Sequence, residues 1–280
     1  MSHIIINGKK NKSNDPCISA YDRGLTLGHG LFETILINKG SIPLLGYHWK
    51  RLVTSTELIG IKLPFDLLEL TNMINELLHE NNLTKIRVAL RLTITDGISE
   101  RGLLSNGNQE PTYILSMSQL PDNITKSMTA IIVDTRRNES SLASRIKSIS
   151  YLDNIIAKRE AVSKGFDEAF LLNSRSNLAE GAISNIFIVK NNHILTPPII
   201  DGALPGVTRH VILNDLVLDD IKVKEQHINT DMLLDADEVF ITNALLGVKP
   251  IHMINNKLFS NEFQITNLIS SSLKEQFNCI

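Results

Sequence analysis

The segment Arg145-Ile146-Lys147-Ser148-Ile149-Ser150-Tyr151-Leu152 leads into a helix that the sequence predicts over residues 151–164. Gly165 follows this range, and glycine commonly ends helices in the left-handed conformation. Lys147 is therefore expected just before a helix. A lysine amine can form a Schiff base with an aldehyde, and burial favours the reactive neutral amine. Position alone does not distinguish this role from that of a surface charge, so both interpretations stay open here.

On either side of this segment, short apolar runs predict strands joined by Asn- and Ser-rich turns. A helix is expected to begin at Val207, after a Pro-Gly loop, and a short helix should end the chain. The regular strand–helix alternation of a Rossmann fold is missing, so the predicted class is α+β. The strands expected in this half are residues 128–134, 168–172, 185–190, 193–196 and 238–242.

The N-terminal half is also expected to mix helices and strands. Leu67, Leu70, Ile74, Leu77 and Leu78 share one helical face, between a proline and an Asn-Asn stop. A second helix follows from the spacing of Trp49, Leu52, Val53 and Thr56. The strands expected are residues 3–6, 85–95 and 113–117, with a hairpin over 32–44 around Asn38-Lys39-Gly40.

The length of 280 residues permits two packed domains. The polar segment 119–126, which contains Pro121, is the expected linker. An N-terminal α+β domain is therefore placed at residues 1–118 and a C-terminal domain at 127–280. A hydrophobic content of 42% suffices for a core in each.

Charge and composition argue against several classes of protein. The net charge of −2, with no basic block, argues against a nucleic-acid partner. The apolar runs are far shorter than the roughly 20 residues of a membrane helix, and the N-terminus lacks the order of a signal peptide. A cytoplasmic protein is expected. Cys17 and Cys279 are isolated and the histidines lack paired spacing, so neither a disulfide framework nor a metal site is predicted.

Two further places could carry chemistry. Glu180, in Asn177–Gly181, could face a buried cationic partner such as a pyridinium nitrogen, or be an exposed charge at a strand end. In Leu204–Arg209 the helix start at Val207–Thr208 offers free N–H groups and a hydroxyl, which favour phosphate binding. An ordinary capped helix is the alternative. Arg51 could supply a phosphate-binding fork, or belong to a solvated helix face.

Taken in order, these segments and several others resemble the class IV aminotransferases, the fold-type IV pyridoxal-phosphate enzymes. Each match is short, but their joint order and spacing from residue 22 to residue 250 is specific. The matching segments are Asp22-Arg23-Gly24, Gly28–Thr34, His48–Leu52, Lys147–Leu152, Gly165–Ala169, Glu180-Gly181, Ser184–Phe187, Thr196–Pro198 and Leu204–Arg209.

The resemblance implies roles for individual residues. Lys147 would carry pyridoxal 5'-phosphate and move protons on the substrate carbon. Glu180 would pair with the pyridine nitrogen of the cofactor. The phosphate would be held by Arg51, the helix start at Val207–Thr208 and the loop at Asn243-Ala244. The family fold implies a smaller α+β N-terminal domain and a larger C-terminal pseudo-barrel domain, in a homodimer that acts on a small molecule.

Among the family's members, three features favour the 4-amino-4-deoxychorismate lyases, which release 4-aminobenzoate and pyruvate for folate biosynthesis. Thr34 is the lyase-like residue in Phe-Glu-Thr and is the candidate for assisting the leaving group. Asn243-Ala244-Leu245 resembles the lyase loop, and Arg101 is a candidate partner for substrate carboxylate. The alternatives are a D-amino-acid or branched-chain aminotransferase and a non-catalytic cofactor-holding protein.

The sequence also departs from the family pattern. His29 stands where an aspartate is frequent, and Asp96 stands where many members have an arginine, which leaves carboxylate recognition open. Leu152 occupies the position of a tyrosine in the branched-chain enzymes, and this argues against that alternative.

Overall fold

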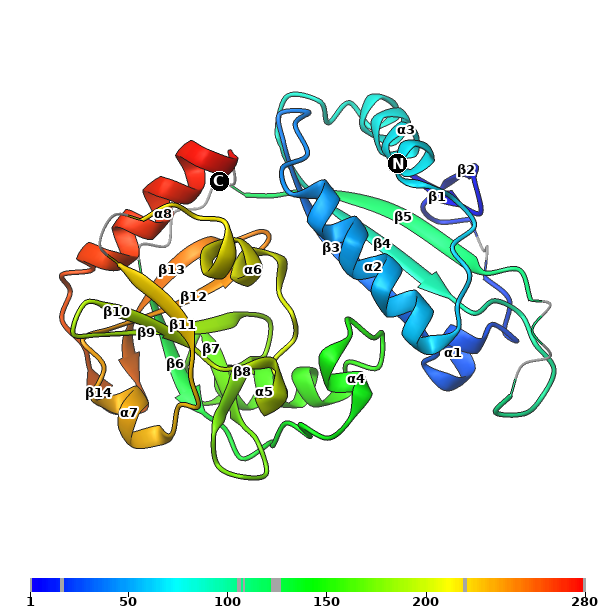
Figure 1. Cartoon of the computed structure of the whole chain (residues 1–280). Coiled ribbons are helices and arrows are strands. Elements are labelled where there is room, and N and C mark those ends of the chain that lie inside the picture. The colour runs from blue at the N-terminus through cyan, green and yellow to red at the C-terminus, as the bar shows by residue number, and fades with distance from the viewer. Residues whose placement is uncertain are drawn as a thin grey trace. The chain divides into compact units, whose positions relative to one another are not determined.

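The computed structural model describes residues 2–15, 18–104, 107, 109–121, 127–218 and 221–278, which form two compact units (Figure 1). Unit 1 comprises Met1–Asp122 and Lys147–Ser150; unit 2 comprises Asn123–Ile146 and Tyr151–Ile280. The lysine segment thus belongs to unit 1, although both of its flanks belong to unit 2. Cys17, Cys279 and residues 122–126 of the predicted linker lie outside the described residues.

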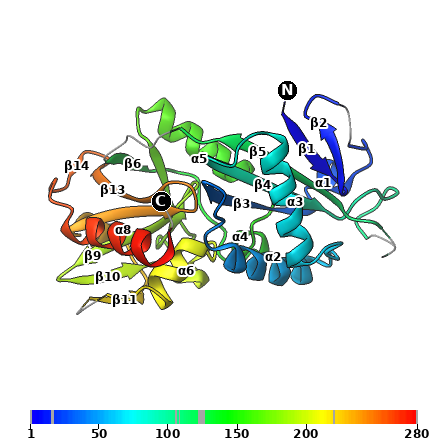
Figure 2. The same cartoon turned by 90° about the horizontal axis from the view of Figure 1, so that it is seen from above.

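Unit 1 is built on a five-stranded antiparallel sheet in the order β2-β1-β5-β4-β3. Its strands are β1 (His3–Ile6), β2 (Lys9–Lys12), β3 (Gly30–Asn38), β4 (Arg87–Thr95) and β5 (Thr112–Gln119). Its helices are α1 (Arg23–Leu27), α2 (Leu45–Ile59) and α3 (Leu67–Glu80). Helix α2 packs against β3, and α3 packs against β1 and β5, along one side of the sheet (Figure 2).

One prediction in this unit is wrong. The hairpin expected over 32–44 has only its first strand, because β3 ends at Asn38 and Ser41 makes no more than an isolated bridge with that residue. Pro43 lacks the N–H that a strand ladder needs. The chain instead turns and enters α2 at Leu45.

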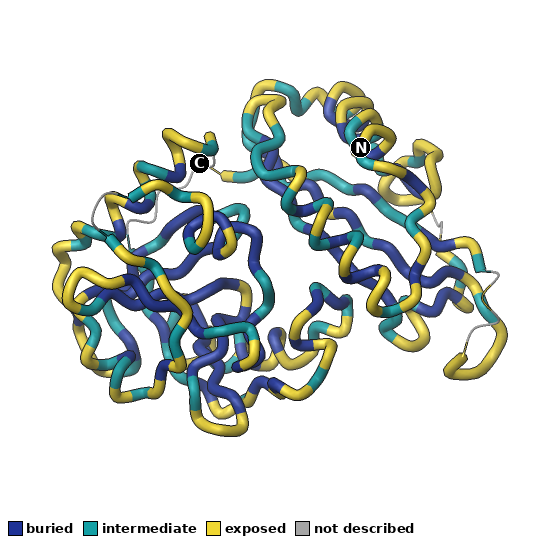
Figure 3. Tube along the Cα trace, viewed as in Figure 1, coloured by how far each residue is buried: buried dark blue, intermediate teal, exposed yellow. Residues whose placement is uncertain are grey.

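Unit 2 is built on a mixed nine-stranded sheet in the order β11-β10-β9-β12-β13-β6-β7-β8, with β14 paired to β13. Its trace is buried along most strands (Figure 3). Every residue of β7 is buried, so this strand has apolar contacts on both faces. The strands are β6 (Met128–Ile132), β7 (Glu168–Leu172), β8 (Leu178–Gly181), β9 (Asn185–Lys190), β10 (His193–Thr196), β11 (Lys222–Glu225), β12 (Glu238–Asn243), β13 (Gly247–Ile254) and β14 (Lys257–Leu258).

The helices of unit 2 lie between these strands along the chain, except α8, which follows β14. Helix α5 spans Leu152–Ser163, and Gly165 follows it at φ 81°, so the predicted helix and its glycine stop are both present. The others are α4 (Leu142–Arg145), α6 (Val207–Asn214), α7 (Thr230–Leu234), α8 (Gln264–Phe277) and the 3₁₀ turn η1 (Ile199–Asp201). Within the described residues, the chain has no helix that is both long enough and apolar enough to span a membrane.

Candidate active site

Lys147 is held by backbone hydrogen bonds to β3. The N–H of Phe32 donates to the carbonyl of Lys147 at 2.9 Å, and the N–H of Ile149 donates to the carbonyl of Gly30 at 3.1 Å. Ser148 forms an antiparallel bridge with Leu31 between them. The lysine segment therefore extends the sheet of unit 1 at its β3 edge, which fixes the start of the lysine side chain.

The side chain of Lys147 reaches the ring of Phe32. Its Nζ lies 4.3 Å from the ring centroid, within the range of a cation–π contact. Side chains alternate along a strand, so Thr34 is on the same face of β3 as Phe32. The structure thus places the predicted donor Thr34 on the face of the strand that Lys147 contacts.

The opposite face of β3 carries a buried carboxylate, Glu33. His48 Nδ1 lies 2.7 Å from Glu33 Oε2, and Arg51 Nε donates to Glu33 Oε1 at 2.8 Å. A terminal nitrogen of Arg51 donates to Oε2 at 2.5 Å. Two of the five N–H donors of Arg51 are therefore directed at Glu33. The part that Arg51 plays in holding phosphate stays a prediction.

This cluster has strongly shifted pKa values. Burial by itself raises the pKa of Glu33, but the charge of Arg51 and the hydrogen bond and charge of His48 outweigh it and lower that pKa to about 2. Burial lowers the pKa of His48, although Glu33 opposes the shift. At neutral pH, Glu33 is therefore an anion, and His48 is a neutral ring that donates its Nδ1–H.

Two of the departures from the family pattern, His29 and Asp96, meet at Arg23. Asp96 Oδ2 lies 3.0 Å from Arg23 Nε and 3.5 Å from His29 Nδ1. The contact with Asp96 is an ion pair without a hydrogen bond, because the Nε–H of Arg23 is directed at His29 Nδ1, 3.4 Å away. The terminal nitrogens of Arg23 donate to the carbonyls of Gly102 and Leu103 at 3.0 and 2.6 Å. Asp96 and His29 thus help to hold the loop that carries Arg101.

Arg101 is exposed and lines a pocket of about 850 Å³ in unit 1, with Tyr21, Arg23, Ile98 and Gln109 among its walls. Among the described residues that line this pocket, neither Lys147 nor Thr34 appears. Within unit 1, Arg101 is therefore not grouped with the residues around Phe32. Its role as a carboxylate partner stays a prediction.

Glu180, in unit 2, is buried in β8 and is not an exposed strand-end charge. Its Oε2 accepts the N–H of Leu204 at 2.8 Å, and its Oε1 lies 2.8 Å from a terminal nitrogen of Arg137. Arg137 also donates to Asn154 Oδ1 at 3.1 Å, and Asn154 Nδ2 donates to the carbonyl of Ala182 at 2.8 Å. These contacts fix the orientation of the Glu180 carboxylate.

Sequence reasoning did not single out Arg137 or Asn154. Both are far from Glu180 along the chain, and an Arg-Arg pair after a strand resembles an ordinary charged turn. Their burial, which is visible only in the fold, distinguishes them.

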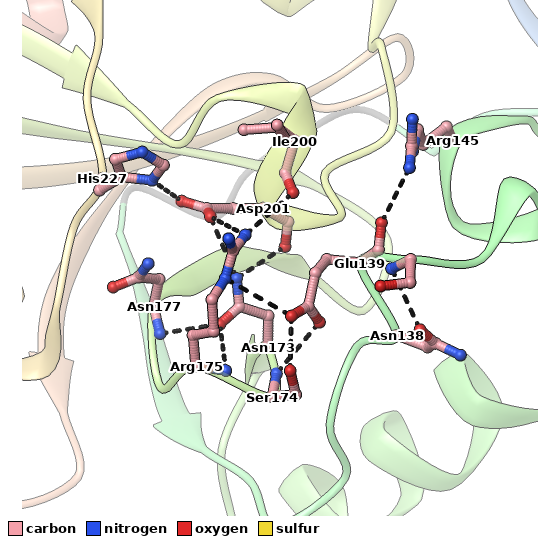
Figure 4. A network of polar contacts seen from close by, with 11 residues as sticks. Asn138, Glu139, Arg145, Asn173, Ser174, Arg175, Asn177, Ile200, Asp201 and His227 are labelled. Atoms are coloured by element: carbon pink, nitrogen blue, oxygen red, sulfur yellow. Dashed lines mark hydrogen bonds and ion pairs between the residues drawn. The ribbon is translucent and has the colours of Figure 1, made fainter.

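Figure 4 shows a second polar network, around Asp201, which lies just before the segment that presents Leu204 to Glu180. Asp201, at the end of η1, is fully buried; it lies 2.7 Å from His227 Nδ1, and Asn173 donates to it at 3.1 Å. Gly202 follows at φ 96°, and its carbonyl accepts from Arg137 Nε at 3.4 Å. The network therefore sets the path of the chain from η1 to Leu204.

The start of α6 is suited to an anion. Its N-cap is Gly206, which makes no side-chain capping bond, so the first N–H groups of the helix have no side-chain partner at that position. A Cβ on Gly206 would lie 2.0 Å from Asn185 Oδ1, so only glycine fits there. Val207 and Thr208 are buried at this end, where N–H groups and the helix dipole favour phosphate.

The loop after β12 is ordered by Asn243. Its Oδ1 accepts the N–H groups of Leu245 and Leu246 at 2.9 and 2.8 Å, and its Nδ2 donates to the carbonyl of Ile183 at 3.2 Å. Because α6 also contacts β12, the loop with Asn243 and Ala244 and the start of α6 belong to neighbouring elements.

The structure therefore gathers the predicted residues within each unit. Unit 1 holds Lys147 and Thr34 on one face of β3 and Arg51 on the other. Unit 2 holds a buried carboxylate and an uncapped helix start, which are the groups that a pyridinium nitrogen and a phosphate require. The types of residue gathered in each unit therefore match the chemical groups of pyridoxal phosphate.

Comparison with known proteins decides the family. The model of the amino-transferase class IV family matches residues 30–254. The chain belongs to the class IV aminotransferases. The predicted family and the predicted α+β, fold-type IV class are confirmed.

Three relatives show the range of this family. The chain is 33% identical, over 99% of its length and 96% of the relative, to a putative branched-chain-amino-acid aminotransferase of Methanocaldococcus jannaschii. It is 31% identical to the aminodeoxychorismate lyase of Bacillus subtilis, over 92% of this chain and 89% of the relative. The structure of a hypothetical aminotransferase from Mycobacterium tuberculosis, in its PLP-bound form, superposes with a TM-score of 0.86 at 19% identity, over 99% of each chain, and this likeness shows the fold.

Proposed function

We propose that this protein is a pyridoxal-phosphate-dependent 4-amino-4-deoxychorismate lyase that releases 4-aminobenzoate and pyruvate in folate biosynthesis. The observation that carries the proposal is the placement of Thr34. Its side chain is on the face of β3 that Lys147 contacts through Phe32. Elimination needs a donor near the departing oxygen, and a threonine hydroxyl can donate such a hydrogen bond.

Each residue has a defined task in this proposal. When bound, pyridoxal phosphate supplies an electron sink for the substrate carbon that bears the amine. Lys147 carries the cofactor and moves the proton at that carbon. Glu180 presents a fixed carboxylate to the ring nitrogen. The start of α6, Arg51 and the Asn243-Ala244 loop hold the phosphate, and Thr34 donates toward the leaving oxygen.

An aminotransferase acting on D- or branched-chain amino acids is the second candidate. It is favoured by the 33% identity with the Methanocaldococcus jannaschii relative, which slightly exceeds the identity with the Bacillus subtilis lyase. Such an enzyme would transfer the amine of its substrate to a keto acid acceptor and would not expel an oxygen. For either activity, we further propose a cytoplasmic homodimer.

A direct assay separates the two candidates. Purified holoenzyme is incubated with aminodeoxychorismate, and 4-aminobenzoate and pyruvate are quantified; parallel reactions contain D-alanine or leucine with a keto acid acceptor. We expect equal amounts of the two lyase products. Absence of both products, together with rapid conversion to the pyridoxamine form by D-alanine or leucine, would establish the aminotransferase instead.

The substitution Thr34→Val tests the observation on which the proposal rests, namely the placement of the Thr34 hydroxyl. Because the substitution keeps the shape but removes the donor, we expect elimination to slow by roughly a hundred- to ten-thousandfold while cofactor binding is unchanged. Thr54→Val, at an exposed position of α2, is the matched control and should leave turnover unaltered. Near-normal elimination by Thr34→Val would mean that Thr34 only packs against the strand.

A further inference from the structure

His227 is an exposed residue of unit 2 whose ring contacts a fully buried carboxylate (Figure 4). Its side chain is 60% exposed, whereas that of Asp201 is 0% exposed, and its Nδ1 lies 2.7 Å from Asp201 Oδ2. An ionised carboxylate can only accept hydrogen bonds, so the Nδ1 that faces it carries the proton. The contact is therefore a hydrogen bond that an exposed ring donates to a buried acceptor.

The backbone fixes the position of this ring. The N–H of Gln226 donates to the carbonyl of Thr196 at 3.0 Å, and the N–H of Leu178 donates to the carbonyl of Ile228 at 2.7 Å. His227 stands between these two hydrogen bonds, which tie its neighbours to the end of β10 and to the start of β8. The ring thus reaches its acceptor from a fixed point of the chain.

The carboxylate of Asp201 has donors at both oxygens. Asn173 Nδ2 and a terminal nitrogen of Arg175 each lie 3.1 Å from Oδ1, whereas His227 is directed at Oδ2. Asn173 is itself buried, and its Oδ1 accepts the N–H groups of Arg175 and Asn177 at 3.0 Å. Loss of the histidine ring would leave Oδ2 without the donor that faces it, and an unsatisfied buried acceptor is costly.

The chain runs from Asp201 directly to the surroundings of Glu180. The carbonyl of Gly202 accepts from Arg137 Nε at 3.4 Å, and the N–H of Leu204 donates to Glu180 Oε2 at 2.8 Å. Arg137 also pairs with Glu180 Oε1 at 2.8 Å. Two contacts just after Asp201 therefore act on the same carboxylate, one directly and one through Arg137. A shift of Asp201 would disturb both.

We propose that His227, acting through Asp201, is a positioning residue for Glu180. The ring holds Asp201 in place, Asp201 holds the chain as far as Leu204, and Leu204 and Arg137 set the direction of the Glu180 carboxylate. The inference rests on the proposed function only in that Glu180 faces the ring nitrogen of pyridoxal phosphate, a role that the lyase and the aminotransferase candidates share.

Hydrogen exchange at one amide tests the positioning in the full-length holoenzyme. With isotope-labelled leucine, NMR follows the N–H of Leu204, and the buried Leu273 of α8 is the internal reference. In His227→Leu, we expect Leu204 to exchange about ten- to a hundredfold faster relative to Leu273, as for loss of a charge-assisted hydrogen bond. A general loss of stability would accelerate both amides alike.

Two further variants separate the hydrogen bond from the bulk of the ring. His227→Asn places an amide N–H where Nδ1 stands, because both nitrogens are bonded to Cγ, so it should restore most of the protection of Leu204. His193→Leu, at an exposed position of β10, is the matched control and should leave Leu204 unchanged. Thermal unfolding verifies that each variant is folded.

Two cofactors show whether the effect reaches the ring nitrogen. Each protein is titrated with pyridoxal phosphate and with its deaza analogue, in which a carbon replaces that nitrogen. In His227→Leu, we expect the affinity for pyridoxal phosphate to fall about three- to tenfold, as for one ordinary hydrogen bond, and the affinity for the analogue to stay unchanged. Glu180→Gln is the positive control and should discriminate between the two cofactors less than the wild type does.

The outcomes distinguish this inference from the proposed function. Unchanged exchange of Leu204 in His227→Leu, equal acceleration of both amides, or no recovery in His227→Asn would overturn the inference. Equal losses for both cofactors in His227→Leu would also overturn it if Glu180→Gln does lower the discrimination. If Glu180→Gln does not, the proposed role of Glu180 fails, and faster exchange of Leu204 alone supports the positioning. If aminodeoxychorismate is not converted, the lyase proposal fails and the inference stands.

Discussion

At the scale of single residues, the site depends on buried charges that are paired within one unit. Glu180 and Arg137 have side chains that are 7% and 9% exposed, and they meet at 2.8 Å. Such a pair adds little net stability, but removing one partner leaves an isolated buried charge, which is costly. The pair therefore holds the carboxylate in place more than it stabilises the fold.

Glu180→Gln tests this arrangement. The amide keeps the shape of the side chain and can still accept the N–H of Leu204, but it leaves Arg137 without its anion. We expect the free energy of unfolding of the cofactor-free protein, measured in urea, to fall by about 3–5 kcal/mol. In its proposed role Glu180 is the negative partner of the ring nitrogen, and for that role we expect turnover to fall strongly with cofactor still bound.

Glu139→Gln is the matched control. Glu139 pairs with Arg175, whose side chain is 52% exposed, and its Oε1 and Oε2 accept the Oγ–H and the N–H of Ser174. The amide keeps one of these two acceptor oxygens, and Ser174 is exposed, so water can accept from the other donor. Exposed ion pairs contribute at most about 1 kcal/mol. Equal losses in the two variants would show that burial of Arg137 does not decide the effect.

At the scale of elements, the start of α6 depends on close packing between a glycine and a strand. Asn185, on β9, donates to the carbonyl and hydroxyl of Thr242 on β12 at 3.0 and 2.9 Å. Gly206 packs so closely against this side chain that any Cβ would displace it. The contact between Gly206 and Asn185 therefore both positions the start of α6 and protects the hydrogen bonds that link β9 to β12.

We expect Gly206→Ala to lower the free energy of unfolding by about 1–3 kcal/mol, because Asn185 must give up buried hydrogen bonds. Affinity for the cofactor should fall as well, since the helix start moves. Gly46→Ala in α2 is the control: nothing lies within 4 Å of its Cβ position, and a helical alanine should add about 0.5–1 kcal/mol. Urea denaturation and cofactor titration measure both; an unchanged Gly206→Ala would contradict the packing argument.

The sequence located elements whose signals are local. Helix α3 is predicted from its apolar face and begins after Asp66, the N-cap residue, which forms a capping box with Glu69. Gly165 ends α5 for an equally local reason. Strand β13 is not among the strands expected from the sequence; it contains Pro250, which has no N–H for the ladder and is unusual in a strand between two neighbours. The partners of Glu180 and the contact between Asp201 and His227 depend on pairing across the fold, and no local pattern contains that information.

At the scale of the whole molecule, the two units carry buried carboxylates whose pKa values shift in opposite directions. In unit 1, Arg51 and His48 outweigh burial and hold the pKa of Glu33 at about 2. In unit 2, burial raises the pKa of Glu168, and Lys158 with hydrogen bonds from Ala169 and Ser184 opposes this only in part. The stabilities of the two units should therefore respond differently to acid.

The pKa of His48 is lower in the folded protein than its ordinary value of 6.5. As the pH falls below 6.5, this histidine therefore binds a proton in the unfolded chain before it does so in the folded one, and unit 1 loses stability. The contribution of Glu33, about 3 kcal/mol for a pKa lowered from 4.5 to about 2, is present above 4.5 and is lost as the pH falls further toward 2. Glu168 affects stability in the opposite direction: because its pKa is raised, its contribution to stability is present below pH 4.5 and is lost as the pH rises through the pKa of the folded state.

Hydrogen exchange of buried amides, corrected for intrinsic rates, measures this difference. Between pH 7 and pH 4, protection from exchange should fall more in β4 than in β7. Glu168→Gln removes the titration and keeps one oxygen that can accept the N–H of Ala169, so the protection of β7 should no longer exceed that of β4 at low pH. A parallel decline of both strands in the wild type would mean that these buried groups do not govern the acid response.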